Sequence, residues 1–145
     1  MKKSNLSEHY FYKSIQKLRK KCKQNGWTVL FKRRIEDYVD FKNNIIIINS
    51  RNSQETQLYR LLHEIGHVIL TQENDYFERY EEEYESMKNM KLLRNRIKLL
   101  SEEVNAWERG LGLAKKENIK INMKKFDDCK AASLNTYVKW IVNNG

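Results

Sequence analysis

The chain has 145 residues, a net charge of +9, 32% charged residues and 40% hydrophobic residues. This length suits one domain with its own core, and the longest apolar run, residues 45–48, is far too short to cross a membrane. The first residues lead into a charged segment instead of an apolar signal sequence, and Cys22 and Cys129 lack metal-binding spacing. We therefore expect a single cytoplasmic domain over residues 1–145, with reduced thiols and no membrane contact.

The positive charge is concentrated at the N-terminal end. Residues 1–34 contain 11 lysines and arginines and one acidic residue, Glu8, whereas the rest of the chain is close to neutral. A basic segment of this kind is typical of contact with nucleic acid or with an acidic protein, but a solvated helix face explains the same pattern. Both interpretations stay open, and nucleic acid is one candidate partner of this segment.

The predicted elements begin with a basic N-terminal helix within residues 1–26. Apolar residues recur there at helical spacing: Phe11, Ile15, Leu18 and Cys22. Ser7 suits the N-cap and Gly26 suits the end of the helix. Residues 27–50 predict a short antiparallel sheet of three strands, at 27–31, 38–41 and 45–48. Residues 42–44 suit a hairpin turn between the last two strands, since asparagine tolerates a positive φ.

Helices follow the sheet. An active-site helix is predicted over residues 53–70, a long helix over 92–113 and a C-terminal helix over 124–143. Residues 73–91 form an acidic insertion with a helical stripe of aromatic and apolar residues: Tyr76, Tyr80, Tyr84 and Met87. The fold class is therefore α+β.

The most informative motif is His63-Glu64-Ile65-Gly66-His67. Two histidines four residues apart on a helix lie one turn apart on the same side, so both imidazoles reach one zinc ion. Glu64 is then placed to act as general base toward a water molecule. The apolar side of this helix lies almost opposite the two histidines. Gly66 is costly inside a helix, and a close approach by a neighbouring element would explain it.

The third zinc ligand lies outside this motif and must be inferred separately. The only other histidine is His9, near the N-terminus, and the metzincin pattern is excluded because Leu70 and Glu73 stand where it requires glycine and histidine. A downstream glutamate is the remaining type of ligand. The long helix carries an apolar stripe formed by Leu93, Ile97, Leu100, Val104, Trp107 and Leu111. Glu102 points away from this stripe, whereas Glu103 lies about 80° from its centre. We therefore choose Glu103, and the acidic residues between positions 73 and 85 remain alternatives.

Two tyrosines are candidate donors to an oxyanion beside the metal. Tyr59 lies one turn before His63, and Tyr137 lies on the C-terminal helix. Both are better explained as core or surface residues. The tryptophans, including Trp107, are read as core aromatics.

The two motifs together resemble the ImmA/IrrE-like metallopeptidases. The resemblance rests on residues 61–67, preceded by a short sheet, and on residues 103–107 of a later helix, within residues 27–112. In that family a glutamate three residues before an alanine completes the zinc site, which corresponds to Glu103 and Ala106. The chain departs from the family pattern at Trp107, where asparagine or aspartate is common, in the acidic insertion, and in its lack of proline.

The resemblance implies a zincin-like domain of the minimal gluzincin type, with Zn²⁺ as its cofactor. It also implies limited, site-specific cleavage of an intracellular regulatory protein, such as the repressor of a phage or mobile element. Two alternatives are kept. One is a non-catalytic zincin-fold module that binds a host factor, and the other is a zinc protease held on DNA by its basic N-terminal helix.

Overall fold

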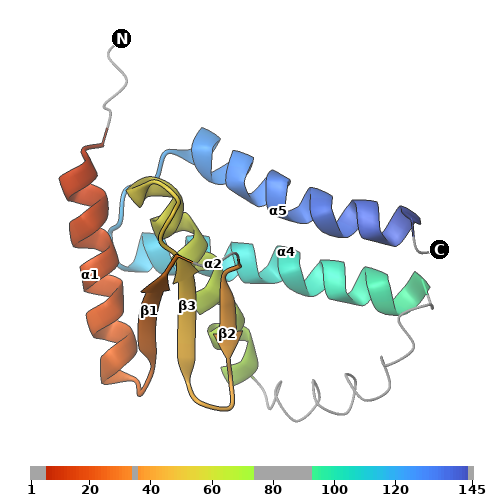
Figure 1. The fold of residues 1–145 in the computed structure, drawn as a ribbon, viewed down its shortest axis with the longest axis horizontal. Helices are drawn as coiled ribbons and strands as arrows, with labels where there is room; N and C mark the ends of the chain where they lie inside the picture. Colours follow the sequence, from red (N-terminus) through yellow and green to blue (C-terminus); the bar gives the residue numbers. More distant parts are fainter. Residues whose placement is uncertain (1–5, 34–35, 74–92, 144–145) are drawn as a thin grey trace.

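A computed structural model describes residues 6–33, 36–73 and 93–143. Its elements in chain order are α1 (Glu8–Gln24), β1 (Thr28–Lys32), β2 (Tyr38–Asp40), β3 (Ile45–Asn49), α2 (Gln54–Gln72), α4 (Leu93–Lys116) and α5 (Met123–Asn143) (Figure 1). These elements confirm the predicted α+β class. The predicted acidic helix over residues 73–91, with its tyrosine stripe, lies outside the described residues apart from Glu73.

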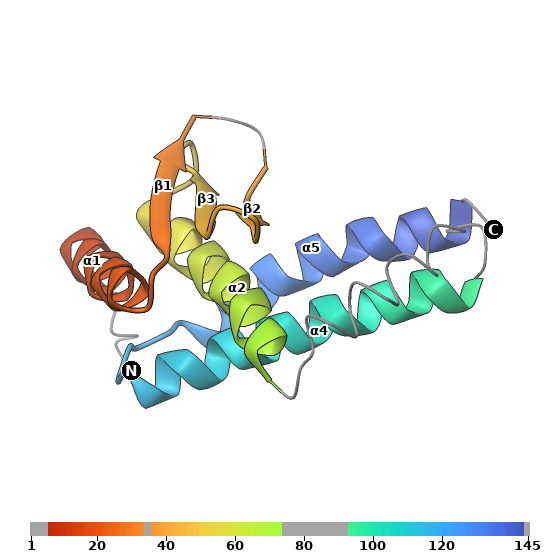
Figure 2. The ribbon, with the colours of Figure 1, turned by 90° about the horizontal axis from the view of Figure 1, so that it is seen from below.

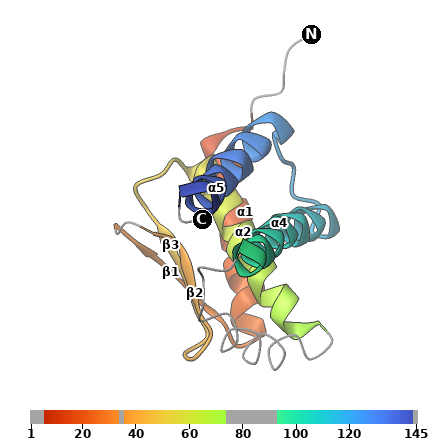
Figure 3. The ribbon, with the colours of Figure 1, turned by 90° about the vertical axis from the view of Figure 1, so that its right-hand side faces the viewer.

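The helices are arranged around α2. The three-stranded sheet lies on one side of α2 and α4 packs against its other side (Figure 3). α1 packs against β1 and α2, while α5 runs back alongside α4 (Figure 2). No helix of the described residues is both long and apolar enough to cross a membrane. The motif helix is thus the central element, and it is held from several sides.

The predicted antiparallel meander is wrong in one strand. β3 lies in the middle of the sheet, antiparallel to β2 as expected but parallel to β1. β1 and β2 are two strand spacings apart, or about 10 Å, with β3 between them. A connection of five residues can reach about 17 Å, which is enough to pass the end of β3. The run of four isoleucines in β3 is typical of a strand covered on both faces, and the structure buries Ile46 and Ile48 on one face and Ile47 on the other. That run was the available signal that β3 is central.

Local signals fix the ends of these elements, as predicted for Ser7, Gly26 and the hairpin turn. Ser7 Oγ accepts a hydrogen bond from the backbone N–H of Tyr10, which caps α1, and Gly26 has a φ of +83° after its end. Ser53 caps α2 in the same way by accepting from the N–H of Thr56. Asn44, in the hairpin turn, has a φ of +54°. Helix α2 therefore begins at a fixed point directly after the sheet.

Helices α2 and α4 cross at unusually short distance because small residues lie at the crossing. A Cβ atom on Gly66 would lie 1.9 Å from the carbonyl oxygen of Ala106. A Cβ atom on Gly110 would lie 2.4 Å from the carbonyl oxygen of Leu62. The predicted reason for Gly66 is confirmed, with α4 as the neighbouring element. This contact brings the middle of α4 directly against the motif.

The buried face of α4 differs from the predicted apolar stripe. Leu93 and Ile97, at the start of that stripe, are about half exposed, at 53% and 48%. The buried residues of the helix are Asn95, Arg96, Glu103, Ala106, Trp107, Gly110 and Ala114. Close packing of small residues, rather than the row of large aliphatic ones, decides which side of α4 faces α2. Glu103 consequently lies within the buried face and not at its edge.

Candidate metal site

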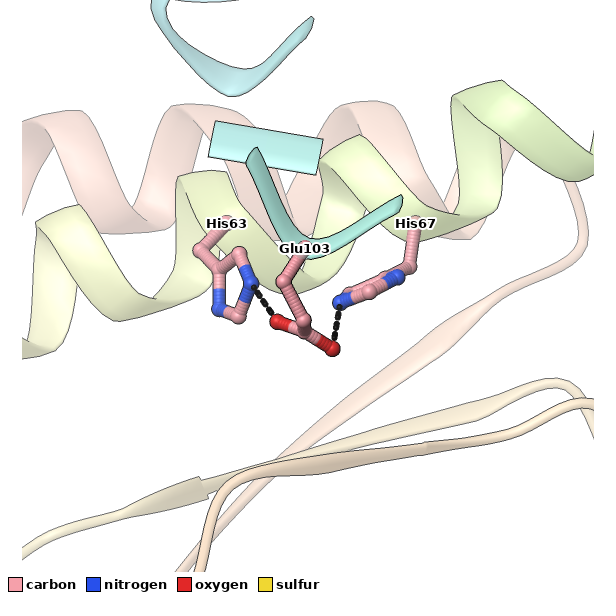
Figure 4. A group of neighbouring side chains, drawn as sticks. All are labelled: His63, His67 and Glu103. Carbon is pink, nitrogen blue, oxygen red and sulfur yellow. Dashed lines mark hydrogen bonds and ion pairs between the residues drawn. The ribbon is translucent and has the colours of Figure 1, made fainter. Parts of the chain in front are cut away.

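The structure brings His63, His67 and Glu103 together (Figure 4). The two histidines project from successive turns of α2, and Glu103 reaches them from α4. Its Oε2 atom lies 2.9 Å from Nε2 of His63, and its Oε1 atom lies 3.2 Å from Nε2 of His67. His63 and Glu103 are buried, whereas the His67 side chain is 22% exposed. One carboxylate thus bridges both imidazoles at the edge of a solvent-accessible space.

These donors fit a zinc ion. One ligand atom from each residue lies within 4.8 Å of the others, and this is the only such group of His, Cys, Asp and Glu among the described residues. Two atoms bound to one tetrahedral zinc at about 2.1 Å are roughly 3.4 Å apart, close to the measured nitrogen–oxygen distances. Two imidazoles and a carboxylate are also a common zinc ligand set that leaves a fourth position open.

The three groups are strongly coupled. Burial lowers the pKa of His63, but the carboxylates of Glu103 and Glu64 outweigh burial and raise the pKa to about 9. Burial raises the pKa of Glu103, whereas hydrogen bonds from both imidazoles outweigh burial and hold that pKa well below its usual range. The carboxylate is therefore negatively charged and attracts cations. A proton and a metal ion compete for the same atoms.

Glu64 lies in the cleft that contains this group. The cleft has a volume of about 670 Å³ and is walled by β2 and the residues before it, by α2, and by one face of α5. Glu64 is buried, and its Oε1 atom lies 3.4 Å from Nδ1 of His63. The carboxylate therefore lies beside the candidate ligands and faces the same space, which suits a group that exchanges protons with a bound water.

The structure separates the other candidates. His9 is exposed on α1, which contributes no residue to the cleft. Glu102 is half-buried and does not line the cleft. Glu73 forms an ion pair with Arg109 instead, with nitrogen–oxygen distances of 2.9 and 3.2 Å. The remaining acidic residues up to position 85 lie outside the described residues.

The two tyrosines have different positions. Tyr59 is fully buried, donates a hydrogen bond to Glu55 and accepts one from the backbone N–H of Asn122. It therefore joins α2 to the start of α5 and does not reach the cleft. Tyr137 does line the cleft, from α5.

Arg60 and Asp37 also belong to the cleft, and they were not identified from the sequence. Arg60 lines the cleft one turn before His63 and forms an ion pair with Asp37, with its Nε 3.8 Å from the carboxylate. Burial raises the pKa of Asp37, and a hydrogen bond from the backbone N–H of Asn49 partly opposes this. Helical phase could have found Arg60, because it precedes His63 and Glu64 by three and four residues. Asp37 carries no comparable signal, because it lies in a connection.

A small sheet beside a helix that carries His-Glu-x-x-His, with a glutamate supplied by a second helix, defines a zincin-like domain. The chain belongs to the family of the IrrE N-terminal-like domain (Peptidase_M78), a family of metallopeptidases whose model matches residues 21–93. The match includes both histidines and Glu64 but ends before Glu103. No curated protein and no solved structure matches the chain.

Proposed function

We propose that this protein is a zinc-dependent endopeptidase that makes limited cuts in an intracellular regulatory protein, such as the repressor of a phage or mobile element. The observation that carries the proposal is the convergence of His63, His67 and Glu103 within 4.8 Å beside Glu64. The matching family of peptidases supports the reaction class. The regulatory substrate is the expectation that the sequence resemblance gave.

The residues divide the chemistry among themselves. His63, His67 and Glu103 would hold the ion, which when bound supplies a Lewis acid for the scissile carbonyl. Glu64 takes a proton from the attacking water and delivers it to the amide nitrogen that leaves. Glu64 is buried beside the candidate ligands, so its carboxylate is positioned for both proton transfers.

The cleft also suits an extended peptide. In the strand order β1-β3-β2, β2 is an edge strand, and Tyr38 and Val39 of β2 line the cleft. A peptide that pairs with the free side of β2 would extend the sheet and lie across the metal site. Because β2 is only three residues long, it would pair with a short segment, which suits one exposed loop of a folded substrate.

The variant Glu64→Gln tests the proposal, because it keeps the shape of the side chain and removes the proton acceptor. Wild type and variant are expressed in the same cells, and new protein N-termini are identified by terminal labelling and mass spectrometry. We expect a few new termini with wild type, none with the variant, and equal zinc content. If zinc-loaded wild type yields no more new termini than the variant, hydrolysis is not the function, and the non-catalytic binding module takes its place.

A further inference from the structure

One candidate zinc ligand has an unusual environment on the face of its ring. The imidazole of His63 and the indole of Trp107 are stacked, with ring centroids 4.3 Å apart and an angle of 9° between their planes. Trp107 is completely buried, and Phe126 of α5 packs edge-on against it at 5.4 Å. The imidazole therefore cannot tilt toward the indole.

Helix α4 contacts His63 in two directions. Glu103 meets the Nε2 atom along the ring edge, and Trp107, one turn later on α4, covers the ring face. The close approach at Gly66 and Gly110 fixes α4 relative to α2, so both contacts are set by one helix crossing. One contact sets where the nitrogen lies, and the other sets the plane of the ring.

The usual support for a metal-bound histidine is different. Such a histidine commonly donates its second ring N–H to a carboxylate, a carbonyl or a water, and this hydrogen bond fixes the ring. Among the described residues, buried Nδ1 of His63 has no hydrogen-bond partner, and Oε1 of Glu64 lies 3.4 Å from it. Because a 3.4 Å ion pair stands in place of that hydrogen bond, the orientation of this ring depends more strongly on the stacked indole.

We infer that Trp107 is a positioning residue of the metal site, which holds the His63 ring in the plane that directs Nε2 to the ion. The inference rests on the proposed zinc site and adds a residue to it. Trp107 is not a catalytic residue, because it touches the ligand and neither the ion nor the substrate.

Three variants separate positioning from simple core packing. Trp107→Phe keeps an aromatic face against the imidazole, whereas Trp107→Leu removes it. Phe126→Leu is the matched control, because Phe126 is equally buried and touches Trp107. Zinc affinity is measured by competition with a chromophoric chelator, and the free energy of unfolding by urea denaturation. We expect binding about 10-fold weaker in Trp107→Leu, and within roughly 3-fold of wild type in the other two.

A second measurement does not use metal. Protons of an imidazole under an indole face are shifted upfield by its ring current, so the carbon-bound ring protons of His63 in the metal-free protein should resonate upfield of those of exposed His9. The shift should disappear in Trp107→Leu and persist in Phe126→Leu.

Each result has a distinct meaning. If wild type binds zinc and Trp107→Leu binds it equally well, or Phe126→Leu loses as much affinity as Trp107→Leu, the positioning role is wrong and the proposed function stands. If wild type binds no zinc, the proposed function fails together with this inference. Ordinary chemical shifts for His63 in the wild-type protein would also overturn the inference.

Discussion

The crossing of α2 and α4 predicts a large effect from a single methyl group. In Gly66→Ala the new Cβ would lie 1.9 Å from the carbonyl oxygen of Ala106, so the helices must separate by roughly 1.5 Å to restore ordinary contact. Backbone cannot rotate away, so we expect a cost of about 3 kcal/mol, at the upper end for overpacking. Alanine also favours the helix by about 1 kcal/mol relative to glycine, which offsets part of this cost. The net destabilisation is about 2 kcal/mol.

A matched pair on α4 isolates the steric part of this effect. In Gly110→Ala the Cβ would lie 2.4 Å from the carbonyl oxygen of Leu62, whereas around Gly112 a Cβ would meet nothing within 4 Å. We expect Gly112→Ala to stabilise the protein by about 1 kcal/mol and Gly110→Ala to destabilise it by about 2 kcal/mol. Both changes have the same helix propensity, so their difference of about 3 kcal/mol reports the crossing alone.

Urea denaturation followed by circular dichroism measures these differences, with the slope m checked for constancy. The Gly66→Ala variant should also bind zinc more weakly, because the separation moves Glu103 away from both histidines. Equal stability of the Gly110→Ala and Gly112→Ala variants would refute the close crossing, and with it the reason that Glu103 reaches the histidines.

Four further predictions concern other parts of the molecule. Tyr59→Phe removes the hydroxyl that bonds the buried Glu55 carboxylate and the backbone N–H of Asn122, and it should cost about 1–3 kcal/mol in urea denaturation without changing zinc affinity. Burial raises the pKa of Cys22 from 9.0 to about 11. The free energy of unfolding should therefore fall as pH rises from 9 to 11, because only the unfolded chain loses this proton there. Cys22→Ala should flatten this dependence on pH, and an unchanged dependence would contradict the prediction. At pH 8, iodoacetamide should modify half-buried Cys129 before Cys22. Zinc should raise the midpoint of thermal unfolding and excess chelator should reverse this, whereas an unchanged midpoint would argue against a site in the native state.

The motif was predictable because it depends on one helix. The spacing of His63 and His67 places both imidazoles on one side of α2 whatever surrounds it. Gly66 also carried information, since an interior glycine without a turn indicates a close neighbour. The choice of Glu103 over Glu102 agrees with the geometry of the cleft, which Glu103 lines and Glu102 does not.

The sheet order and the buried side of α4 were not predictable by the same reasoning. Alternating patterns identify strands but do not say which of them pair, and β1 became parallel to β3 through a connection long enough to step over it. On α4, periodicity selects large apolar residues, whereas the tight crossing selects small ones such as Ala106 and Gly110. The stacking of Trp107 on His63 depends on that crossing and was therefore invisible in the sequence.

The basic residues of α1 line no part of the described cleft. Contact of this helix with nucleic acid or with an acidic protein stays a prediction from charge alone. Binding to duplex DNA that weakens steeply with salt would support a tethered protease.

Helices α2 and α4 are proposed to hold one zinc ion jointly. The most direct measurement is the zinc stoichiometry and affinity of the wild-type protein beside Glu103→Ala and its neighbour control Glu102→Ala. We predict one zinc per chain in wild type and in Glu102→Ala, with affinity lower by about 10-fold or more in Glu103→Ala. Wild-type affinity in Glu103→Ala would contradict the account, because the carboxylate that bridges both imidazoles would then hold no metal.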